Sequence, residues 1–430
     1  MGGHMLSITR SLFTAVGLLA LSSAAIAEQV TPDDRVKTRV IIRQNPTTES
    51  APVGRLLVGE SLELARELSG WYEVRLPDGS LGYVSKAWTK PIEEGQPEVA
   101  STNSSSFKIH VIDIGTGLAI FIEGTDFAML YDGGSQDDLA KGKDNRILAY
   151  IKAVSPTLKI LNHLVLSHPH KDHVELLPDI FDKFDIKHVW DSGTVNPTRG
   201  YCNFLSKVSQ EVGVKYHDAI SSGQVRSVAC KAGVVSIKQA EQMSALPVTL
   251  GQNAKMHILH RDATKYHDPN ENSVVVRLDL GGKRILLAGD AEGGERRDPS
   301  FPPDANSVEE KLLNCCAADL RADALVVGHH GSKSSSRSTF IDAVGAKVYV
   351  ISSGPHTYGK NHIVLPDDEI VTLLEARGKV FRTDIDDEEC IVSEAKIGPD
   401  VDESPGGCSN VVIEINKSGE LTVAKSLADD

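Results

Sequence analysis

Apolar and polar positions along the chain fall into regions with different periodicities. Between residues 32 and 92, short apolar runs such as Val40-Ile41-Ile42 and Leu81-Gly82-Tyr83-Val84 are separated by turn signals such as Pro77-Asp78-Gly79. Short strands with regularly spaced turns predict a small all-β barrel over residues 32–92. Residues 93–106 are polar and rich in serine, proline and glycine, which is typical of a linker.

From Phe107 onward, apolar runs of strand length alternate with amphipathic stretches of helix length. Strands are expected at 107–114, 119–122, 128–131, 164–166, 324–327 and 347–351, with a hairpin formed by 273–278 and 284–288. Helices are expected at 145–153, 308–314 and 367–376. This alternation predicts one α/β or α+β domain with mixed sheets over residues 107–430.

The start of the chain carries the pattern of an export signal. Arg10 precedes an apolar run from Leu12 to Leu21, and the small-x-small sequence Ala25-Ile26-Ala27 follows. This order predicts a cleavable signal peptide at residues 5–27 and a mature protein that is periplasmic or extracellular, without a transmembrane segment. The alternative is an uncleaved anchor, although the run is short for crossing a bilayer. Residues 1–4 are interpreted as a cloning remnant.

Export changes the interpretation of the cysteines. An even number of cysteines in an oxidising compartment predicts disulfide bonds, and the chain has six. Nearness in sequence favours Cys202–Cys230 and Cys390–Cys408, each of which would contribute about 3 kcal/mol. A bond between the adjacent Cys315 and Cys316 would be strained, so these two are expected to pair elsewhere, to bridge to the C-terminal pair or to remain free. The absence of a C-x-x-C spacing argues against a cysteine-based zinc site.

The net charge limits the classes of partner. The chain has 45 lysines and arginines against 59 acidic residues, a formal charge of −14. Proteins that grip nucleic acid mainly through its phosphates are usually basic. The composition therefore argues against loose DNA binding, but it leaves room for a local basic groove or for a substrate anchored by metal.

A cluster of metal-ligating residue types directly follows the predicted strand at 164–166. His168, His170, Asp172 and His173 lie within six residues. A strand end is rigid, so the loop leaving it can hold several ligands in one place. Imidazole and carboxylate groups suit zinc, manganese and iron. We expect two divalent ions, with His168 and His170 facing one and Asp172 and His173 facing the other; the alternative is a solvated histidine-rich loop.

The H-x-H-x-D-H pattern of this cluster resembles the signature of the metallo-β-lactamase fold superfamily, which implies an αββα sandwich. In that superfamily an aspartate at a strand end bridges the two metals, and Asp290, after Leu286-Leu287-Ala288-Gly289, takes that place. The resemblance also implies that one of His329 and His330 completes the second metal site and that the other contacts substrate. His330 is the preferred ligand, zinc is the default ion, and manganese and iron are the alternatives.

A finer resemblance is to the extracellular metallo-β-lactamase-like domain of the bacterial competence DNA-uptake proteins of the ComEC type. It covers about residues 107–385 and is carried by these segments: His110 to Gly115, Tyr131 to Gly134, Asn270 to Ser273, Gly289-Asp290, His329 to Ser332 and Tyr358-Gly359.

This sequence also departs from the pattern of that branch. Thr116-Gly117-Leu118 lacks the usual acidic group, Glu175-Leu176 replaces a glycine pair, and Lys360-Asn361 displaces a histidine to His362. The extra histidine ligand that many superfamily members carry before the bridging aspartate has no clear match. His260 is a candidate, with a surface or hairpin histidine as the other interpretation. These departures weaken the case for DNA as substrate more than the case for metal binding.

Within the predicted barrel, the order G-W-Y-x-V, D-G, G-Y-V, which starts at Gly70, resembles the bacterial Src-homology-3-like domain. Such domains often bind cell-wall peptides or act as spacers, and both roles remain open here.

Together these features predict an exported dinuclear metal-dependent hydrolase of the phosphodiesterase or nuclease type. The two ions would share Asp290 and a hydroxide that attacks phosphorus, with Asp172, His329 and His330 as the catalytic residues. The expected substrate contains phosphate, with nucleic acid as one candidate. The alternatives are a hydrolase of another exported substrate (a phosphorylcholine ester, lactone or β-lactam) and a non-enzymatic, cell-wall-associated metal-binding protein.

Overall fold

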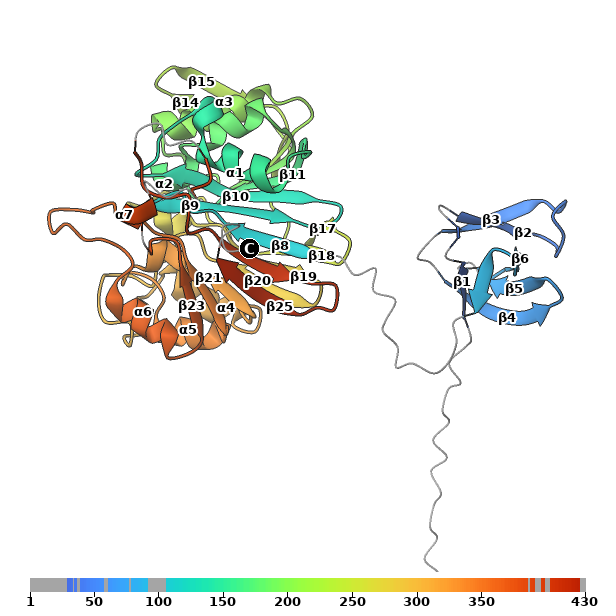
Figure 1. The fold of residues 1–430 in the computed structure, drawn as a ribbon. Coiled ribbons are helices and arrows are strands. Elements are labelled where there is room, and N and C mark those ends of the chain that lie inside the picture. The colour runs from blue at the N-terminus through green and yellow to red at the C-terminus, as the bar shows by residue number, and fades with distance from the viewer. Residues whose placement is uncertain are drawn as a thin grey trace, which may run out of the picture. The chain divides into compact units, whose positions relative to one another are not determined.

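A computed structural model describes residues 29–33, 35–36, 39–57, 61–76, 79–91, 106–385, 387–390, 396–398 and 403–425. The chain divides into two compact units, Met1–Asn103 and Ser104–Asp430 (Figure 1). The predicted cloning remnant, the signal peptide at 5–27 and nearly all of the predicted linker at 93–106 lie outside the described residues. Within the described ranges, no helix combines the length and apolarity that are needed to cross a membrane.

The N-terminal unit is all β, as predicted. Its seven strands pair in the order β3-β2-β6-β5-β4-β1-β7, and every pair is antiparallel. The strands are β1 (Gln29–Pro32), β2 (Arg39–Arg43), β3 (Pro52–Leu57), β4 (Leu62–Leu68), β5 (Trp71–Arg75), β6 (Leu81–Ser85) and β7 (Thr89–Pro91). Alternate residues of β2 are buried, so Val40 and Ile42 enter a small core with Leu56 and Val74.

The C-terminal unit contains a nine-stranded mixed sheet in the order β16-β13-β12-β11-β10-β9-β8-β24-β25. Strands β10, β11, β12, β13 and β16 run parallel to one another, and the remaining pairs are antiparallel. The strands are β8 (Phe107–Val111), β9 (Gly117–Glu123), β10 (Ala128–Ser135), β11 (Ile160–Leu166), β12 (Asp185–Asp191), β13 (Lys215–Asp218), β16 (Ala240–Gln242), β24 (Val411–Ile415) and β25 (Leu421–Lys425).

A seven-stranded sheet faces the first one, in the order β17-β18-β19-β20-β21-β22-β23. Its strands are β17 (Val248–Gly251), β18 (Ala254–His260), β19 (Val275–Leu280), β20 (Lys283–Leu287), β21 (Ala324–Val326), β22 (Val348–Ile351) and β23 (Lys379–Arg382). The strands from β20 to β23 are parallel neighbours, and the predicted hairpin is formed by β19 and β20. A separate two-stranded hairpin comprises β14 (Arg226–Cys230) and β15 (Gly233–Ile237).

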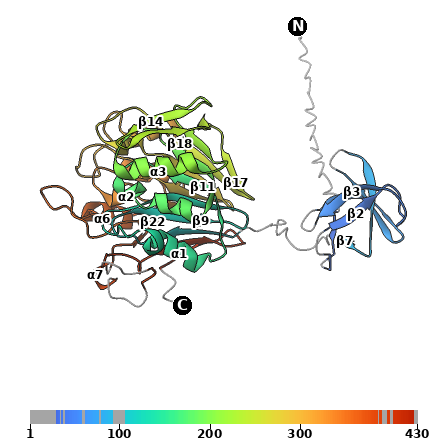
Figure 2. The same ribbon diagram turned by 90° about the horizontal axis from the view of Figure 1, so that it is seen from above.

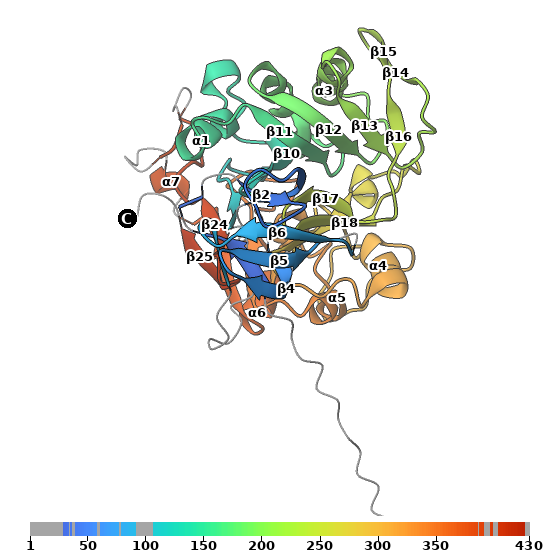
Figure 3. The same ribbon diagram turned by 90° about the vertical axis from the view of Figure 1, so that its right-hand side faces the viewer.

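Helices cover the outer faces of both sheets. Figures 1 and 2 show α1 (Arg146–Val154) and α3 (Arg199–Gln210) over the nine-stranded sheet. Figure 1 shows α4 (Val308–Cys316), α5 (Ser338–Val344) and α6 (Asp368–Glu375) on the outer side of the seven-stranded sheet, and Figure 3 shows the same three helices from another side. Three buried apolar clusters fill the interfaces between the four layers. This αββα sandwich confirms the predicted fold class.

Helix α1 illustrates how the sequence sets an element. The side chain of Asn145 caps its start by accepting hydrogen bonds from the backbone N–H groups of Ile147 and Leu148. Ile147 and Ile151, four residues apart, are fully buried against the sheet. The helix runs one residue further than predicted at its C-terminal end, and α4 and α6 also match predicted segments to within about two residues.

The cysteines form three disulfides, and none among the described residues is free. The expected Cys202–Cys230 bond joins α3 to β14, and the expected Cys390–Cys408 bond joins α7 (Asp387–Cys390) to the segment before β24. Cys315 and Cys316 are bonded to each other at the end of α4, so the expectation that they pair elsewhere or stay free was wrong. The other four cysteines are already paired, which leaves these two only each other.

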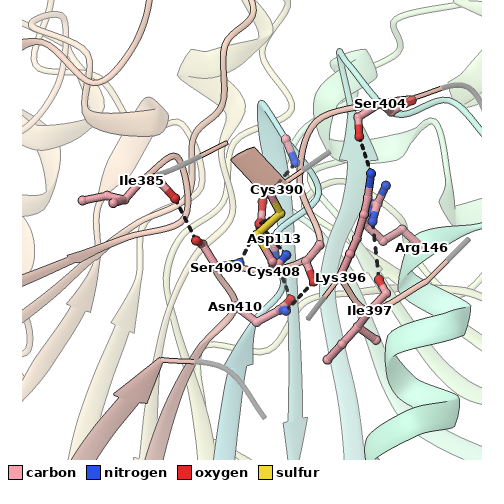
Figure 4. Close-up of a disulfide and its surroundings, with 12 residues drawn as sticks. Asp113, Arg146, Ile385, Cys390, Lys396, Ile397, Ser404, Cys408, Ser409 and Asn410 are labelled. Carbon is pink, nitrogen blue, oxygen red and sulfur yellow. Dashed lines mark hydrogen bonds between the residues drawn. A yellow bond between two sulfur atoms is a disulfide. The ribbon is translucent and has the colours of Figure 1, made fainter. Parts of the chain in front are cut away.

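A buried aspartate beside the Cys390–Cys408 bond joins the first and last parts of the domain (Figure 4). The Asp113 carboxylate, just after β8, accepts hydrogen bonds from the backbone N–H groups of Cys408 (3.1 Å) and Ser409 (2.9 Å). In return, the Asn410 side chain accepts a hydrogen bond from the Asp113 backbone N–H at 2.9 Å. These contacts fix the register in which β24 pairs with β8.

Candidate metal centre

The predicted ligands converge from the carboxyl ends of strands in both sheets. His168 and His170 follow β11, and Asp172 and His173 lie in the short helix α2 (Lys171–Val174). Asp290 follows β20, and the next parallel strand, β21, leads into the turn that carries His329 and His330. Because the two sheets face each other, these strand ends meet at one edge of the sandwich.

Asp290 lies at the centre of the group. Its Oδ2 atom is 3.1 Å from His173 Nε2 and 3.7 Å from the Nε2 atoms of both His168 and His330. His330 Nε2 is in turn 3.6 Å from Asp172 Oδ2. Two sets of ligand atoms each lie within 4.8 Å of one another: His168, His173 and Asp290, and then Asp172, His173 and His330. Every residue of both sets is buried.

The three central imidazoles are each held by the nitrogen that faces away from the cluster. His173 Nδ1 is 2.8 Å from Asp132 Oδ2, His330 Nδ1 is 2.9 Å from the Ser352 carbonyl oxygen, and His168 Nδ1 is 3.0 Å from Ser167 Oγ. An acceptor on Nδ1 fixes the tautomer that leaves the Nε2 lone pair available for a metal ion. The Nε2 atoms of His173 and His330 and the Oδ1 atom of Asp290 are buried without a hydrogen-bond partner.

Unpartnered buried polar atoms are costly in a folded protein. Here several of them point at one another at distances too long, or at angles too poor, for hydrogen bonds. This arrangement fits side chains that share a positive ion, and the imidazole and carboxylate donors suit zinc, manganese or iron. The residues present therefore fit the metal centre that the sequence predicts.

The charges of the cluster depend on each other. Burial alone would raise the pKa of the Asp290 carboxyl, but His173 and His330 hold it well below its usual value. Burial would lower the pKa of His173, whereas Asp290 and Asp132 raise it well above the usual value. The pKa of His168 is lowered by burial and by the neighbouring His173. Without a metal ion, Asp290 is thus ionised, His168 is neutral and His173 is protonated, so a metal ion would have to displace the proton on His173 Nε2.

Two glycines permit the close packing behind the site. Gly289 has φ +55°, and a Cβ atom there would lie 2.8 Å from the Cβ atom of Ser167. A Cβ atom on Gly134 of β10 would lie 2.3 Å from the Lys171 carbonyl oxygen and 2.6 Å from the His173 backbone nitrogen. The backbone of β10 therefore packs directly against the backbone of α2, and this contact holds Asp172 and His173 in place.

The structure separates the two adjacent histidines. Both have left-handed backbones, with φ +50° at His329 and +52° at His330, an uncommon state for non-glycine residues. His330 points into the cluster, whereas His329 Nδ1 lies 2.8 Å from both Glu292 Oε1 and Ser334 Oγ. Burial would lower the pKa of His329, but Asp290 and Glu292 raise it to about 9, so its imidazole is protonated at neutral pH.

The remaining predicted histidines lie further out. His170 is partly exposed: its Nδ1 atom is 3.0 Å from His168 Nε2, and its Nε2 atom is 3.7 Å from Asp268 Oδ1. His260 ends β18 and is buried, so a surface position for it was wrong; its Nδ1 atom is 2.7 Å from the Ser273 carbonyl oxygen. It belongs to neither set of converging ligand atoms.

Several residues around the site were not singled out from the sequence. Asp132 supports His173, and Tyr358 donates a hydrogen bond to Asp172 Oδ2 at 3.1 Å. Asn270 donates to Glu292 Oε1 at 3.3 Å. A cavity of about 350 Å³ opens beside His329, with Arg296, Ser332, Glu292, Tyr358, Ile363 and Leu365 among its lining residues. The segments of Asp132, Asn270 and Tyr358 carry the ComEC-type resemblance, and this was the signal that could have identified them.

The fold and the converging ligands agree with comparisons to known proteins. The family model described as "Metallo-beta-lactamase superfamily" matches residues 112–356, and that of the bacterial SH3 domain matches residues 38–90. The chain belongs to the metallo-β-lactamase superfamily, a superfamily of metal-dependent hydrolases, and its N-terminal unit is a bacterial SH3 domain.

Among curated proteins, the chain is similar to ComE operon protein 3 of Bacillus subtilis (strain 168), with 25% identity over 293 residues. It is also similar to competence protein ComA of Neisseria gonorrhoeae, with 24% identity over 291 residues. The matches cover 65% and 67% of this chain but 32% of each relative, so the chain spans about a third of their length. The resemblance to ComEC-type proteins is thereby confirmed at low identity.

Solved structures show the same kind of likeness at lower identity. The metallo-β-lactamase fold protein YhfI from Bacillus subtilis is 13% identical, with a TM-score of 0.38, and the match covers 65% of this chain and 97% of YhfI. A diphosphatase from the PhnP family is 14% identical, with a TM-score of 0.34, and the match covers 64% of this chain and 94% of that protein.

Proposed function

We propose that the chain is an exported phosphodiesterase that uses two divalent metal ions, most simply zinc. The observation that carries the proposal is the central position of Asp290, whose Oδ2 atom lies 3.7 Å from both His168 Nε2 and His330 Nε2. A carboxylate placed between two sets of ligands is suited to bridging two ions. His168, His170, Asp172, His173, Asp290 and His330 would hold them.

When bound, the ions would supply Lewis acidity and make water nucleophilic near neutral pH. The chain's own residues would do the rest. Asp132, Ser167 and Ser352 orient the imidazoles, and Tyr358 fixes the carboxylate of Asp172. His329 is held protonated by Glu292 beside the cavity, which suits it to donate a proton to a departing alkoxide.

The cavity beside His329 favours a phosphoester over an uncharged substrate. Arg296 lines it and donates a hydrogen bond to Ser332 Oγ at 2.8 Å, while its other terminal nitrogen pairs with Asp367 at 2.6 Å. An arginine that is already fixed in orientation can bind a phosphate oxygen with little further loss of side-chain entropy. Protonated His329 also lines the cavity, together with the carboxylates of Glu292 and Glu295, of which Glu292 pairs with His329.

The test combines metal content with turnover on two bond types, a phosphodiester and a β-lactam. Purified protein should contain two ions per chain by mass spectrometry and should hydrolyse bis-p-nitrophenyl phosphate but not the β-lactam nitrocefin. Asp290→Ala should abolish turnover and keep the circular dichroism spectrum. The control Asp342→Ala removes an exposed ion pair with Arg377 and should change nothing. Hydrolysis of nitrocefin alone, or full activity in Asp290→Ala, would contradict the proposal.

Export would be tested separately, by fractionating cells that express the full chain. Mature protein in the periplasm or medium, with an N-terminus near residue 28, would support a cleaved signal peptide. Full-length protein in the membrane fraction would support the anchor instead.

A further inference from the structure

The N-terminal unit has a cavity of about 430 Å³, and none of the residues that line it belongs to the metal centre. Three arginines and two tryptophans line it, with Ile41 between them: Arg35, Arg39, Arg43, Trp71 and Trp88. None of the described residues that line it is acidic. The cavity therefore combines positive charge with aromatic surface.

Strand β2 places two of the arginines on one face. Its sequence is Arg-Val-Ile-Ile-Arg, and Val40 and Ile42 point into the core. Side chains alternate along a strand, so Arg39, Ile41 and Arg43 all face the cavity. Four residues of strand separate the two guanidinium-bearing positions by about 13 Å. Ile41, which lies between them, is itself exposed.

Among the described residues, no carboxylate pairs with Arg39 or Arg43. Within the described part of the chain, the Arg39 side chain makes no hydrogen bond or ion pair, and the Arg43 guanidinium donates to the Ser50 carbonyl oxygen at 2.6 Å. Arg35, by contrast, pairs with Asp33 at 2.7 Å. The positive charges of Arg39 and Arg43 are therefore not neutralised by any described carboxylate.

The charge of the whole protein does not oppose an anion at this place. Residues 29–91 contain nine lysines and arginines and eight acidic residues, so the excess of acidic residues behind the net charge of −14 lies elsewhere in the chain. Surface charges are screened beyond about 10 Å at 0.1 M salt. A ligand at Arg39 and Arg43 therefore meets a locally positive surface.

The aromatic side chains supply a second kind of contact. Trp88 is exposed over 52% of its surface. The Arg35 guanidinium lies over its ring, 5.8 Å from the ring centre. Trp71 is half-buried in β5 and also lines the cavity. Flat rings of this kind, next to arginines, form platforms on which nucleobases stack.

We propose that this cavity binds single-stranded nucleic acid, with phosphates on Arg39 and Arg43 and a base stacked on Trp88. Each unit of a single strand offers both a negative charge and a flat ring, which matches both halves of the lining. An acidic peptide would supply the charges but would leave the indoles without a partner. The binding depends on the N-terminal unit alone, and it deepens the proposed function because a captured strand is a phosphodiester polymer.

The test uses the full chain and a fluorescein-labelled fifteen-residue oligothymidylate, followed by fluorescence anisotropy. EDTA keeps the probe intact. Wild type should bind saturably, and Trp88→Ala should weaken binding about five- to hundredfold, the usual range for a lost base–aromatic stack. Arg39→Ala should also weaken binding and should reduce the slope of log K against log salt by about 0.7, the value for one phosphate contact on a single strand.

Controls separate this role from the fold and from hydrolysis. Arg75→Ala removes the same charge from the same unit at a position outside the cavity lining, where Arg75 forms an exposed ion pair with Glu63, and it should bind like wild type. Trp88→Ala, Arg39→Ala and Arg75→Ala should all hydrolyse bis-p-nitrophenyl phosphate at the wild-type rate, because this substrate is too small to require binding in the cavity. Binding without any turnover would refute the proposed hydrolase but not this site.

Two results would overturn the inference. One is unchanged oligothymidylate affinity in both Trp88→Ala and Arg39→Ala. The other is a fifteen-residue oligoglutamate that binds as tightly as the oligothymidylate and displaces it, because such a site would recognise acidic peptides through charge alone.

Discussion

Replacing Asp132 with asparagine tests whether a residue that touches no substrate controls metal affinity. The Asp132 carboxylate is fully buried, and its Oδ2 atom lies 2.8 Å from His173 Nδ1 and 2.7 Å from Ser167 Oγ. Its Oδ1 atom accepts the backbone N–H of Ser167 at 2.6 Å. In Asp132→Asn, one of these oxygens becomes an amide donor.

Both orientations of the new amide are unfavourable. With its nitrogen toward His173, Nδ1 must act as an acceptor, so a neutral ring carries its proton on Nε2 and cannot bind metal through that atom. With its nitrogen toward Ser167, two N–H donors face each other. We expect metal affinity to fall ten- to hundredfold, the usual effect of losing the partner of a ligating histidine. This corresponds to about 1.4–2.7 kcal/mol.

The measurement is zinc titration of the metal-free protein against a chromophoric chelator, with circular dichroism as the check on folding. Asp342→Asn, an exposed carboxylate in α5, is the matched control and should bind zinc like wild type. A folded Asp132→Asn protein with wild-type affinity for both ions would refute the reasoning that the Asp132–His173 contact sets the tautomer.

Three further predictions follow from the same geometry. His330→Ala should lose bound metal, whereas His329→Ala should keep it and lose about 10²–10⁴-fold in kcat; equal metal contents in the two variants would contradict the assignment. The pKa of His329 is raised to about 9, above its ordinary value of 6.5. In the metal-free protein, protonated His329 should therefore contribute about 3 kcal/mol to the free energy of unfolding. This contribution should be complete below about pH 6.5 and lost as the pH rises to about 9. The stability difference between wild type and His329→Ala, measured by urea unfolding across that range, should shrink accordingly, and a constant difference would count against it. Replacing both Cys202 and Cys230 with serine should lower the free energy of unfolding by about 3 kcal/mol, and an unchanged urea midpoint would show that the bond carries no stability.

Much of the metal centre could be predicted because its ligands follow recognisable strands. The apolar residues Leu164 to Leu166 lie one residue before His168, and the apolar strand β20 precedes Asp290. In a sandwich of two sheets, such strand ends collect at one edge. Residue chemistry and local sequence pattern were therefore sufficient to identify the ligand residues, but they did not show how these residues are arranged around the site.

The arrangement depends on contacts between distant segments. Asp132 reaches His173 because β10 and β11 pair in parallel, with Tyr131 opposite Val165, and this register is not visible in either strand. His330 was preferred over His329 as a ligand from the sequence, but the sequence gives no geometric reason for that preference. In the structure, two left-handed residues in succession direct the two side chains apart. Glu292 became meaningful only through its contact with His329.

Some structure was missed although its signal was present. Helix α3 has a capping Thr198, whose side chain accepts a hydrogen bond from the Tyr201 backbone N–H, and buried residues Tyr201, Phe204, Leu205 and Val208 at helical spacing. The place of β24 beside β8 could not be found in this way. Nearly three hundred residues separate them, and alternating apolar residues do not identify a partner strand.

The pairing of β24 with β8 affects how the domain reaches its folded state. Val411 lies opposite Val111 and Ile415 opposite Phe107. Strand β8, early in the domain, therefore cannot complete its pairing until β24 has been synthesised. Until residues 403–425 are available, one edge of β8 is an open row of backbone donors and acceptors, the kind of edge on which chains aggregate. Contacts so distant in sequence also slow folding. The hydrolase domain can therefore complete its folding only after nearly all of it has been synthesised.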